Sequence, residues 1–290
     1  MAYSCLGSKK LIAMNVDHVT LCGPELEALR EAFSHAGLET EYGGPHANGV
    51  THMALLGFGD GSYLELIAPQ TPGETAGSHW GGMMTEAAGC CAWAIMVENI
   101  QTEVSRLNSV GIETKGPLPG SRKRPDGKVL RWEIASAGPG EPGAMLPFMI
   151  QDHTPREWRV QPPTGANEAG LTGVVTVVLG VKDMRAASEM FRRAYGWDEP
   201  DVQEDSEFGS LAHFAGTPVM LASHPQESSW LATRLQKFGE RPAAFLLGSY
   251  DLRGAARHFH LSKVEKWFGR EVAWFEGEQF PALRLGVTAV

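Results

Sequence analysis

The chain of 290 residues contains no uninterrupted apolar run of membrane-spanning length, and its acidic residues outnumber its basic ones. A helix that crosses a bilayer needs about 20 consecutive apolar residues, so no membrane partner is expected. The formal net charge of −9 argues against general nucleic-acid binding, which needs basic side chains to neutralise phosphates. A globular protein remains, and a hydrophobic content of 43% is enough to form a sizeable core.

Cysteine is scarce, and the four cysteines show no paired spacing of the kind that binds zinc: Cys5, Cys22, Cys90 and Cys91. The adjacent Cys90 and Cys91 are poorly placed to bridge each other, so reduced thiols are expected. Near the start, Lys9 and Lys10 precede only four apolar residues, which is too short for the apolar region of a signal peptide. A cytoplasmic location is therefore expected.

The chain contains a repeated pattern of predicted strands and helices. Four times a strand-like run leads into a short amphipathic helix and then into further strand-like runs separated by turn residues. Each predicted helix carries an apolar pair seven residues apart, which two helical turns bring back to one face. These pairs are Leu26 and Phe33, Ile100 and Leu107, Met184 and Phe191, and Leu252 and Phe259. Glycines follow the first three helices, as is typical of helix ends: Gly37, Gly111 and Gly196.

Each repeat thus predicts a β-α-β-β-β unit, and no unit is long enough to bury both faces of its sheet alone. A segment rich in Pro, Gly and polar residues, 161–170, reads as a linker between two pairs of units. We therefore predict an α+β fold of four βαβββ units in two domains, 1–160 and 171–290.

The first unit carries two histidines and one carboxylate that suit a divalent metal: His18, His52 and Glu65. Two neutral imidazoles and a carboxylate, with open positions left over, are what iron, manganese or zinc centres use to bind substrates directly. A lone histidine in a strand is more often a hydrogen-bonded structural residue. Glu65 lies between two leucines in an apolar strand, however, and an ionised carboxylate is rarely buried there without a partner.

The expected convergence of this trio depends on the turn at 59–61. If the turn is tight, so that Gly59 pairs with Ser62, then Leu56 lies opposite Glu65. Because side chains alternate along a strand, His52 and Glu65 then share one face. His46, in an expected loop, is an alternative ligand or acid–base group, against the more ordinary interpretation of a surface histidine.

Basic residues cluster around a turn in the second unit: Arg122, Lys123, Arg124, Lys128 and Arg131. Such a cluster is most often a solvated hairpin. It can also attract an anionic ligand.

At several motifs the chain resembles the vicinal oxygen chelate superfamily, which holds glyoxalase I, the extradiol dioxygenases and the bleomycin-resistance proteins, and within it the glyoxalase-like domain group. The resemblance covers residues 11–160 by motif and 171–290 only in pattern. Its motifs are Asp17-His18-Val19, Gly43-Gly44-Pro45-His46, Thr51-His52, the run from Asp60 to Glu65, Arg124-Pro125-Asp126-Gly127, Arg131-Trp132, the run from Leu146 to Gln151, and Thr154-Pro155-Arg156.

The resemblance implies paired units that form U-shaped mixed sheets, with a metal on the concave face. His18 and Glu65 fall on the ligand positions of the first and last strands of a unit, with His52 as third ligand for Fe, Mn, Zn, Co or Ni. The implied substrate is a small molecule with adjacent oxygens, on which His52 or His46 moves protons. Further candidates for substrate contact are Tyr63, Phe148, Arg124 and Arg131.

The other units depart from this pattern. Aligned on their helix starts, they place Ala92, Thr176 and Ala244 where His18 stands, so only one unit keeps the ligand pair. Two interpretations follow for the N-terminal half: a metal-dependent lyase, isomerase or ring-cleaving dioxygenase, or a non-catalytic protein that binds or sequesters a small molecule. The C-terminal half is expected to be a scaffold or an interface, and a homodimer is left open.

Overall fold

The computed structural model describes residues 14–290 except 87–88, 125, 162–169 and 277–282. Its first mixed sheet has eight strands in the order β2-β3-β4-β1-β5-β8-β7-β6. The strands are β1 (Asn15–Cys22), β2 (Glu41–Pro45), β3 (Thr51–Gly57), β4 (Tyr63–Pro69), β5 (Gly89–Met96), β6 (Thr114–Lys123), β7 (Val129–Ala137) and β8 (Phe148–Asp152). The helices of this half are α1 (Leu26–His35), α2 (Gly81–Thr85), α3 (Ile100–Ser109) and α4 (Arg156–Arg159).

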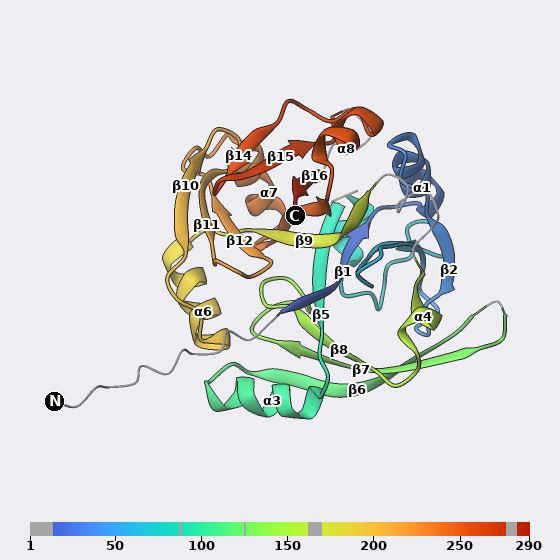
Figure 1. Ribbon diagram of the computed structural model, residues 1–290. Helices are drawn as coiled ribbons and strands as arrows, with labels where there is room; N and C mark the ends of the chain where they lie inside the picture. Colours follow the sequence, from blue (N-terminus) through green and yellow to red (C-terminus); the bar gives the residue numbers. More distant parts are fainter. Residues whose placement is uncertain (1–13, 87–88, 125, 162–169, 277–282) are drawn as a thin grey trace.

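The second mixed sheet repeats this arrangement, in the order β10-β11-β12-β9-β13-β16-β15-β14. Its strands are β9 (Leu171–Gly180), β10 (Asp201–Asp205), β11 (Gly209–His213), β12 (Val219–Ser223), β13 (Arg241–Ser249), β14 (Glu265–Trp267), β15 (Arg270–Trp274) and β16 (Arg284–Ala289). Its helices are α6 (Met184–Tyr195), α7 (Trp230–Phe238) and α8 (Leu252–His258). The predicted α+β fold of four βαβββ units is confirmed, with curled sheets (Figure 1). Of the expected linker, residues 162–169 lie outside the described residues.

The two units of the first sheet meet at β1 and β5, which pair antiparallel, while each of these strands pairs in parallel with the last strand of its own unit. In the central ladder His18 lies opposite Ala94, and Thr20 lies opposite Ala92. A local two-fold axis between β1 and β5 accounts for these two pairs. It exchanges the strands and relates His18 to Ala92 and Thr20 to Ala94. The alignment of the units made on the sequence is therefore the one that the backbone adopts.

All four helices predicted from apolar pairs form. Met184 is partly buried, and the other members of the pairs are buried in the core, as Leu26 and Phe33 are in α1. Three of these helices begin at a side-chain cap; in α3, Asn99 accepts a hydrogen bond from the backbone of Thr102. Helix α6 ends at Gly196, which adopts a left-handed conformation with φ 71°. In Figure 1, helices α1, α3 and α6 lie at the periphery of the molecule.

The two sheets share a continuous apolar core and touch directly, because β9 packs beside β1 and β13 beside β5. At this junction Asp60 donates its backbone N–H to Thr172 O (3.2 Å), and Ser62 Oγ accepts from the backbone N–H of Val174 (2.8 Å). The β3–β4 turn is therefore held by the second half of the chain.

The predicted register of that β3–β4 hairpin is wrong by one residue. Leu55, not Leu56, lies opposite Glu65, and the backbone N–H of Phe58 closes the turn on Ser62 O. The loop contains three residues rather than two, with Gly61 at φ 87°. Because side chains alternate, a slip of one residue moves a whole strand's side chains to the opposite face. His52 is thereby turned away from Glu65.

Cys22, Cys90 and Cys91 are buried free thiols, and Cys5 lies outside the described residues. Among the helices of the described part, none is both long and apolar enough to pass through a bilayer.

The contact between the halves gives a stability test at Gly173. A methyl group there would lie 1.9 Å from Asp60 Oδ2, and Asp60 is fixed because its Oδ1 accepts hydrogen bonds from Ser62 N and Oγ. We expect Gly173→Ala to lower the free energy of unfolding by about 1–3 kcal/mol, measured by urea denaturation. Gly82→Ala, where no atom lies within 4 Å of the added carbon, is the control and should leave the value unchanged or slightly higher. Equal losses in the two variants would show that the junction does not constrain the hairpin.

Candidate functional site

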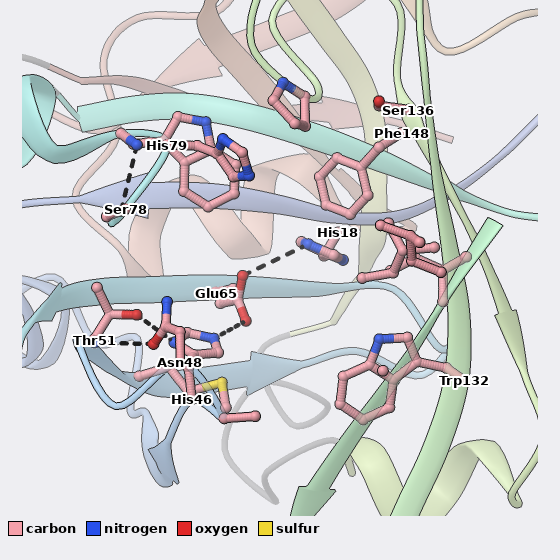
Figure 2. A pocket seen from close by; sticks show the side chains of 18 of the residues that line it. His18, His46, Asn48, Thr51, Glu65, Ser78, His79, Trp132, Ser136 and Phe148 are labelled. Atoms are coloured by element: carbon pink, nitrogen blue, oxygen red, sulfur yellow. Dashed lines mark hydrogen bonds and ion pairs between the residues drawn. The ribbon is translucent and has the colours of Figure 1, made fainter. Parts of the chain in front are cut away.

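A cavity of about 680 Å³ opens on the concave face of the first sheet (Figure 2). This volume lies within the range of sites that enclose small molecules. Alternating side chains of its strands face it, among them Met53 and Leu55 from β3 and Ile134 from β7. Aromatic rings complete the wall, namely Tyr63, Trp80, Trp132 and Phe148. The cavity is therefore mostly apolar, and its few polar groups stand out.

Glu65 is the acidic group on the cavity floor, and Figure 2 shows it between two imidazoles. Its Oε2 lies 3.6 Å from His18 Nε2, and its Oε1 lies 3.4 Å from His46 Nε2. Thr20 Oγ1 also donates to Oε2, at 3.3 Å. Burial raises the pKa of Glu65, but the hydrogen bond from His46 and the charges of His18, His46 and Arg122 lower it to about 2 overall. The carboxylate is therefore ionised at neutral pH.

His18 is almost fully buried, with 3% of its surface exposed. Its ring stacks on Tyr63 at 4.6 Å between centroids and meets Phe148 edge-on at 5.3 Å. Its Nδ1 lies 2.6 Å from Asp17 Oδ1, which fixes the ring so that Nε2 faces Glu65. Ring orientation by a carboxylate on the far nitrogen is a common device in sites that use imidazole.

Asp17 is completely buried and belongs to an ion cluster behind the cavity. Arg159 Nη2 donates to Asp17 Oδ2 at 2.9 Å, and Arg156 forms a second, shorter ion pair with the same oxygen. Burial raises the pKa of Asp17, but Arg159 and the hydrogen bond with His18 outweigh it and hold this pKa far below its usual range. Adjacent strand residues normally face opposite sides. Here a bulge, where β1 shifts register against β5 between Val16 and His18, lets Asp17 reach the His18 ring.

His46 follows β2 and is drawn into the site rather than left on the surface. Its Nδ1 lies 2.8 Å from Thr51 Oγ1, and its backbone N–H donates to Thr51 O. About a quarter of the side chain is exposed, 28%, so this imidazole connects Glu65 to solvent.

Three of the residues predicted for the site do not reach the cavity. His52 lies on the other face of β3, where its ring meets Tyr42, and burial lowers its pKa. Arg124 donates to Trp158 O, and Arg131 is exposed on β7. The predicted arrangement of His18, Glu65 and His52 as one ligand set is thus wrong, because it depended on the wrong hairpin register. Of the residues expected to contact substrate, Tyr63 and Phe148 line the cavity.

Two arginines that were not singled out for the site line it, Arg122 and Arg159. Arg122 belongs to the basic cluster seen in the sequence. Its side chain points from β6 into the cavity wall, whereas Lys123 and Arg124 do not line the cavity. Asp17 was named only as part of the Asp17-His18-Val19 motif and was given no role in the site, although an acidic residue directly before a histidine in an apolar strand is a usable signal.

The donor set does not fit a closed, protein-ligated metal centre. In the parallel ladders Thr20 pairs with Glu65 and its counterpart Ala94 pairs with Phe148, so the two-fold axis places Phe148 where Glu65 stands. Ala92 likewise replaces His18, so the second unit supplies no donor at these two corresponding positions. Within the described ranges, no group of three or more His, Cys, Asp or Glu side chains converges in a way that could hold an ion.

The concave face of the second sheet is filled rather than hollow. Phe208 packs against Trp267 at 5.1 Å, Trp274 at 5.4 Å and Trp230 at 6.0 Å between ring centroids, and the cavity beside them measures only about 10 Å³. Thr176 occupies the position of His18. Among the described residues, the cavity on this face is thus far smaller than the cavity on the first sheet.

Comparison with known families then gives a match to the glyoxalase-like domain model over residues 16–195. The chain belongs to this glyoxalase-like family. The predicted resemblance to the vicinal oxygen chelate superfamily is confirmed. A search among curated proteins found no significant match.

Solved structures share the fold of this glyoxalase-like protein over 96% of its length. A hypothetical protein from Staphylococcus aureus has 12% identity and a TM-score of 0.61, with 100% of its own chain covered. A triple mutant of 4-hydroxymandelate synthase from Streptomyces coelicolor has 13% identity and a TM-score of 0.61, with 92% covered. A xylose isomerase-like TIM barrel/4-hydroxyphenylpyruvate dioxygenase fusion protein has 12% identity and a TM-score of 0.57, with 49% covered. At these identities the likeness shows the fold alone.

The donor set predicts the metal content of the protein. We expect protein produced without an affinity tag, in medium supplemented with Fe, Mn, Zn, Co and Ni, to contain well below one bound ion per chain by elemental analysis, because only part of a ligand set is present. One ion per chain, lost in Glu65→Gln and kept in His52→Gln, would contradict this and restore a metal centre.

The low pKa of Glu65 predicts an acid-dependent contribution to stability. Since the folded-state pKa is about 2 and the ordinary value is 4.5, the contribution is fully present above pH 4.5 and is lost as pH falls toward 2. Its size is on the order of 3 kcal/mol. The difference in unfolding free energy between the wild type and Glu65→Gln, from urea denaturation, should shrink between pH 6 and pH 3. The corresponding difference for Gly82→Ala, which changes no titratable group, should lack this acid dependence. A constant Glu65→Gln difference would show that the carboxylate is not stabilised by its imidazoles.

Proposed function

We propose that this glyoxalase-like protein binds a small molecule with a mostly apolar body in the N-terminal cavity and transfers a proton on it. The observation that carries the proposal is the ionised Glu65 carboxylate, held between the His18 and His46 imidazoles on the floor of an otherwise apolar cavity. Burying a charge in such a place costs free energy. Two arginines offset this cost for Asp17, whereas the direct partners of Glu65 among the described residues are imidazoles.

Glu65 is the proton acceptor in this mechanism. When a ligand with a carbonyl group fills the cavity and displaces water, a carboxylate oxygen takes a proton from the carbon next to that carbonyl. The electron pair of the C–H bond moves to form an enolate, and the proton returns to the same or to the neighbouring atom. Displacing water also weakens the solvation of the carboxylate, which raises its basicity toward the range that general-base catalysis requires.

The two imidazoles have different parts in this step. His18 is fixed by Asp17 and stacked on Tyr63, so it holds Glu65 in place from the buried side. His46 is partly exposed, and its Nε2 faces the other carboxylate oxygen, so it exchanges protons between Glu65 and solvent. Tyr63 and Phe148 provide the apolar wall against which the ligand body packs.

Two other functions remain to be weighed against this one. Metal-dependent chemistry on adjacent oxygens stays a prediction, and the incomplete donor set counts against it. Binding or sequestration without chemistry is favoured by one specific observation, the mostly apolar lining of the cavity, and it differs from our proposal only in the role of Glu65.

Proton transfer can be tested without knowing the natural substrate. We expect the protein to catalyse exchange of the α-hydrogens of small 2-oxo acids or α-hydroxy ketones with D2O, followed by ¹H NMR. Glu65→Gln should reduce the rate by about 100-fold or more, because the amide cannot accept the proton. His52→Gln, a change on the neighbouring strand that faces away from the cavity, is the matched control and should keep the rate.

Exchange that survives in Glu65→Gln would remove this residue from the chemistry. Binding of panel members, seen as a thermal shift, without exchange in the unaltered protein would favour the binding-protein alternative.

A further inference from the structure

Arg122 is a buried cation that forms no direct ion pair with an acidic side chain in the described part of the chain. It lines the cavity from β6 and is 8% exposed. Its guanidinium contacts neutral acceptors and feels the charge of Glu65 only at longer range, whereas the nearby Arg159 pairs with both Asp17 and Asp152. A buried charge normally has a counter-charge, so its absence here requires an explanation.

The guanidinium is nevertheless held rigidly. Nη1 donates to Gly43 O at 3.0 Å and meets Met53 Sδ at 3.5 Å, while Nη2 donates to Arg159 O at 2.9 Å. These contacts fix it to β2, β3 and α4 at once. A methyl group on Gly43 would lie 2.9 Å from Nη1, so glycine at this position leaves the space that Arg122 occupies.

Its hydrogen-bonding capacity is not used up by these contacts. A guanidinium has five N–H groups, and the three contacts leave Nε–H and one Nη2–H without an acceptor among the described residues. Nε and Nη2 are neighbours on the fork, in the geometry that matches the two oxygens of a carboxylate.

Two other side chains of the cavity wall carry donors without an acceptor among the described residues, Trp80 Nε1 and Arg159 Nε. Both atoms are closed off from solvent, so they do not offer a hydrogen bond to a molecule in the cavity. The free N–H groups that a ligand can meet are those of Arg122. Because Glu65 is already engaged by its imidazoles, the acceptor for these groups is expected from the ligand.

We propose that Arg122 binds a carboxylate of the ligand, so that the cavity selects small carboxylic acids with an apolar or aromatic body. This deepens the proposed function, on which it rests for the identity of the site. The acid group lies at the β6 side, and the body extends along Trp132 and Phe148 toward Glu65.

The test compares carboxylic acids with their primary amides, which have the same shape and no charge. We expect 3-phenylpropanoate and 4-phenylbutanoate to bind the full-length protein about 10- to 100-fold more tightly than the matching amides, measured by isothermal titration calorimetry. In Arg122→Gln the acid should lose this advantage. Arg122→Lys keeps the charge without the fork, so it should retain only part of it.

Arg124→Gln is the matched control. It makes the same change of charge two positions along the chain from Arg122, and the Arg124 side chain does not line the cavity. It should keep the full preference for acids. The comparison of acid and amide binding by the unaltered protein already tests the proposal, so the test does not depend on whether an Arg122 variant folds.

Equal binding of acid and amide by the unaltered protein, no binding of any acid, or an acid preference that survives in Arg122→Gln would overturn the proposal. Glu65→Gln separates it from the proposed function. That variant should bind acids at least as well as the unaltered protein, because it removes a like charge from the cavity, while losing deuterium exchange. An acid preference without exchange in the unaltered protein would leave the Arg122 site standing and remove the proton-transfer function.

Discussion

The buried charge of Asp17 is the constraint around which the N-terminal site is built. Asp17 is inaccessible to solvent, so its charge depends on Arg156, Arg159 and the His18 ring. These partners come from β1 and α4, and Arg156 also donates to Gly61 O in the β3–β4 turn. One carboxylate therefore orients the imidazole that faces Glu65, and it ties the segment after β8 to the hairpin that carries Glu65. Removing it would leave Asp152 as the remaining acidic partner of both arginines and would take the carboxylate away from His18 Nδ1.

The four units share one backbone arrangement but carry different side chains on the concave faces of their sheets. The two-fold axis of the first sheet relates His18 to Ala92 and Glu65 to Phe148, so one unit supplies polar groups and the other supplies apolar wall. In the second sheet the corresponding face is closed by aromatic rings around Phe208. The sheet geometry thus provides a concave face, and side-chain size decides whether that face is a cavity or a core.

The fold was accessible from the sequence because its signals are local and repeated. Apolar pairs at helical spacing, such as Leu26 and Phe33, identified the four sheet-packing helices, and the position of Glu65 in an apolar strand marked it as unusual. The site was accessible only in part. His18 and Glu65 were placed together correctly, but His52 was placed with them through a turn assumed to be one residue shorter, and the contact of His46 with Glu65 depends on how the β2–β3 loop folds back on Thr51.

By itself, the sequence determined the repeat, the pairing of units and the chemical types available to the site, because hydrophobic periodicity and composition are properties of short segments. The tertiary structure alone decided which of these groups meet. A bulge brings Asp17 to His18, a three-residue turn turns His52 away, and packing against Gly43 and Arg159 places Arg122, of all the basic residues in its hairpin, in the cavity wall. Each of these outcomes depends on a shift of one residue or on a contact between distant segments. Alternation in a strand amplifies such a shift into a change of face, which no local pattern encodes.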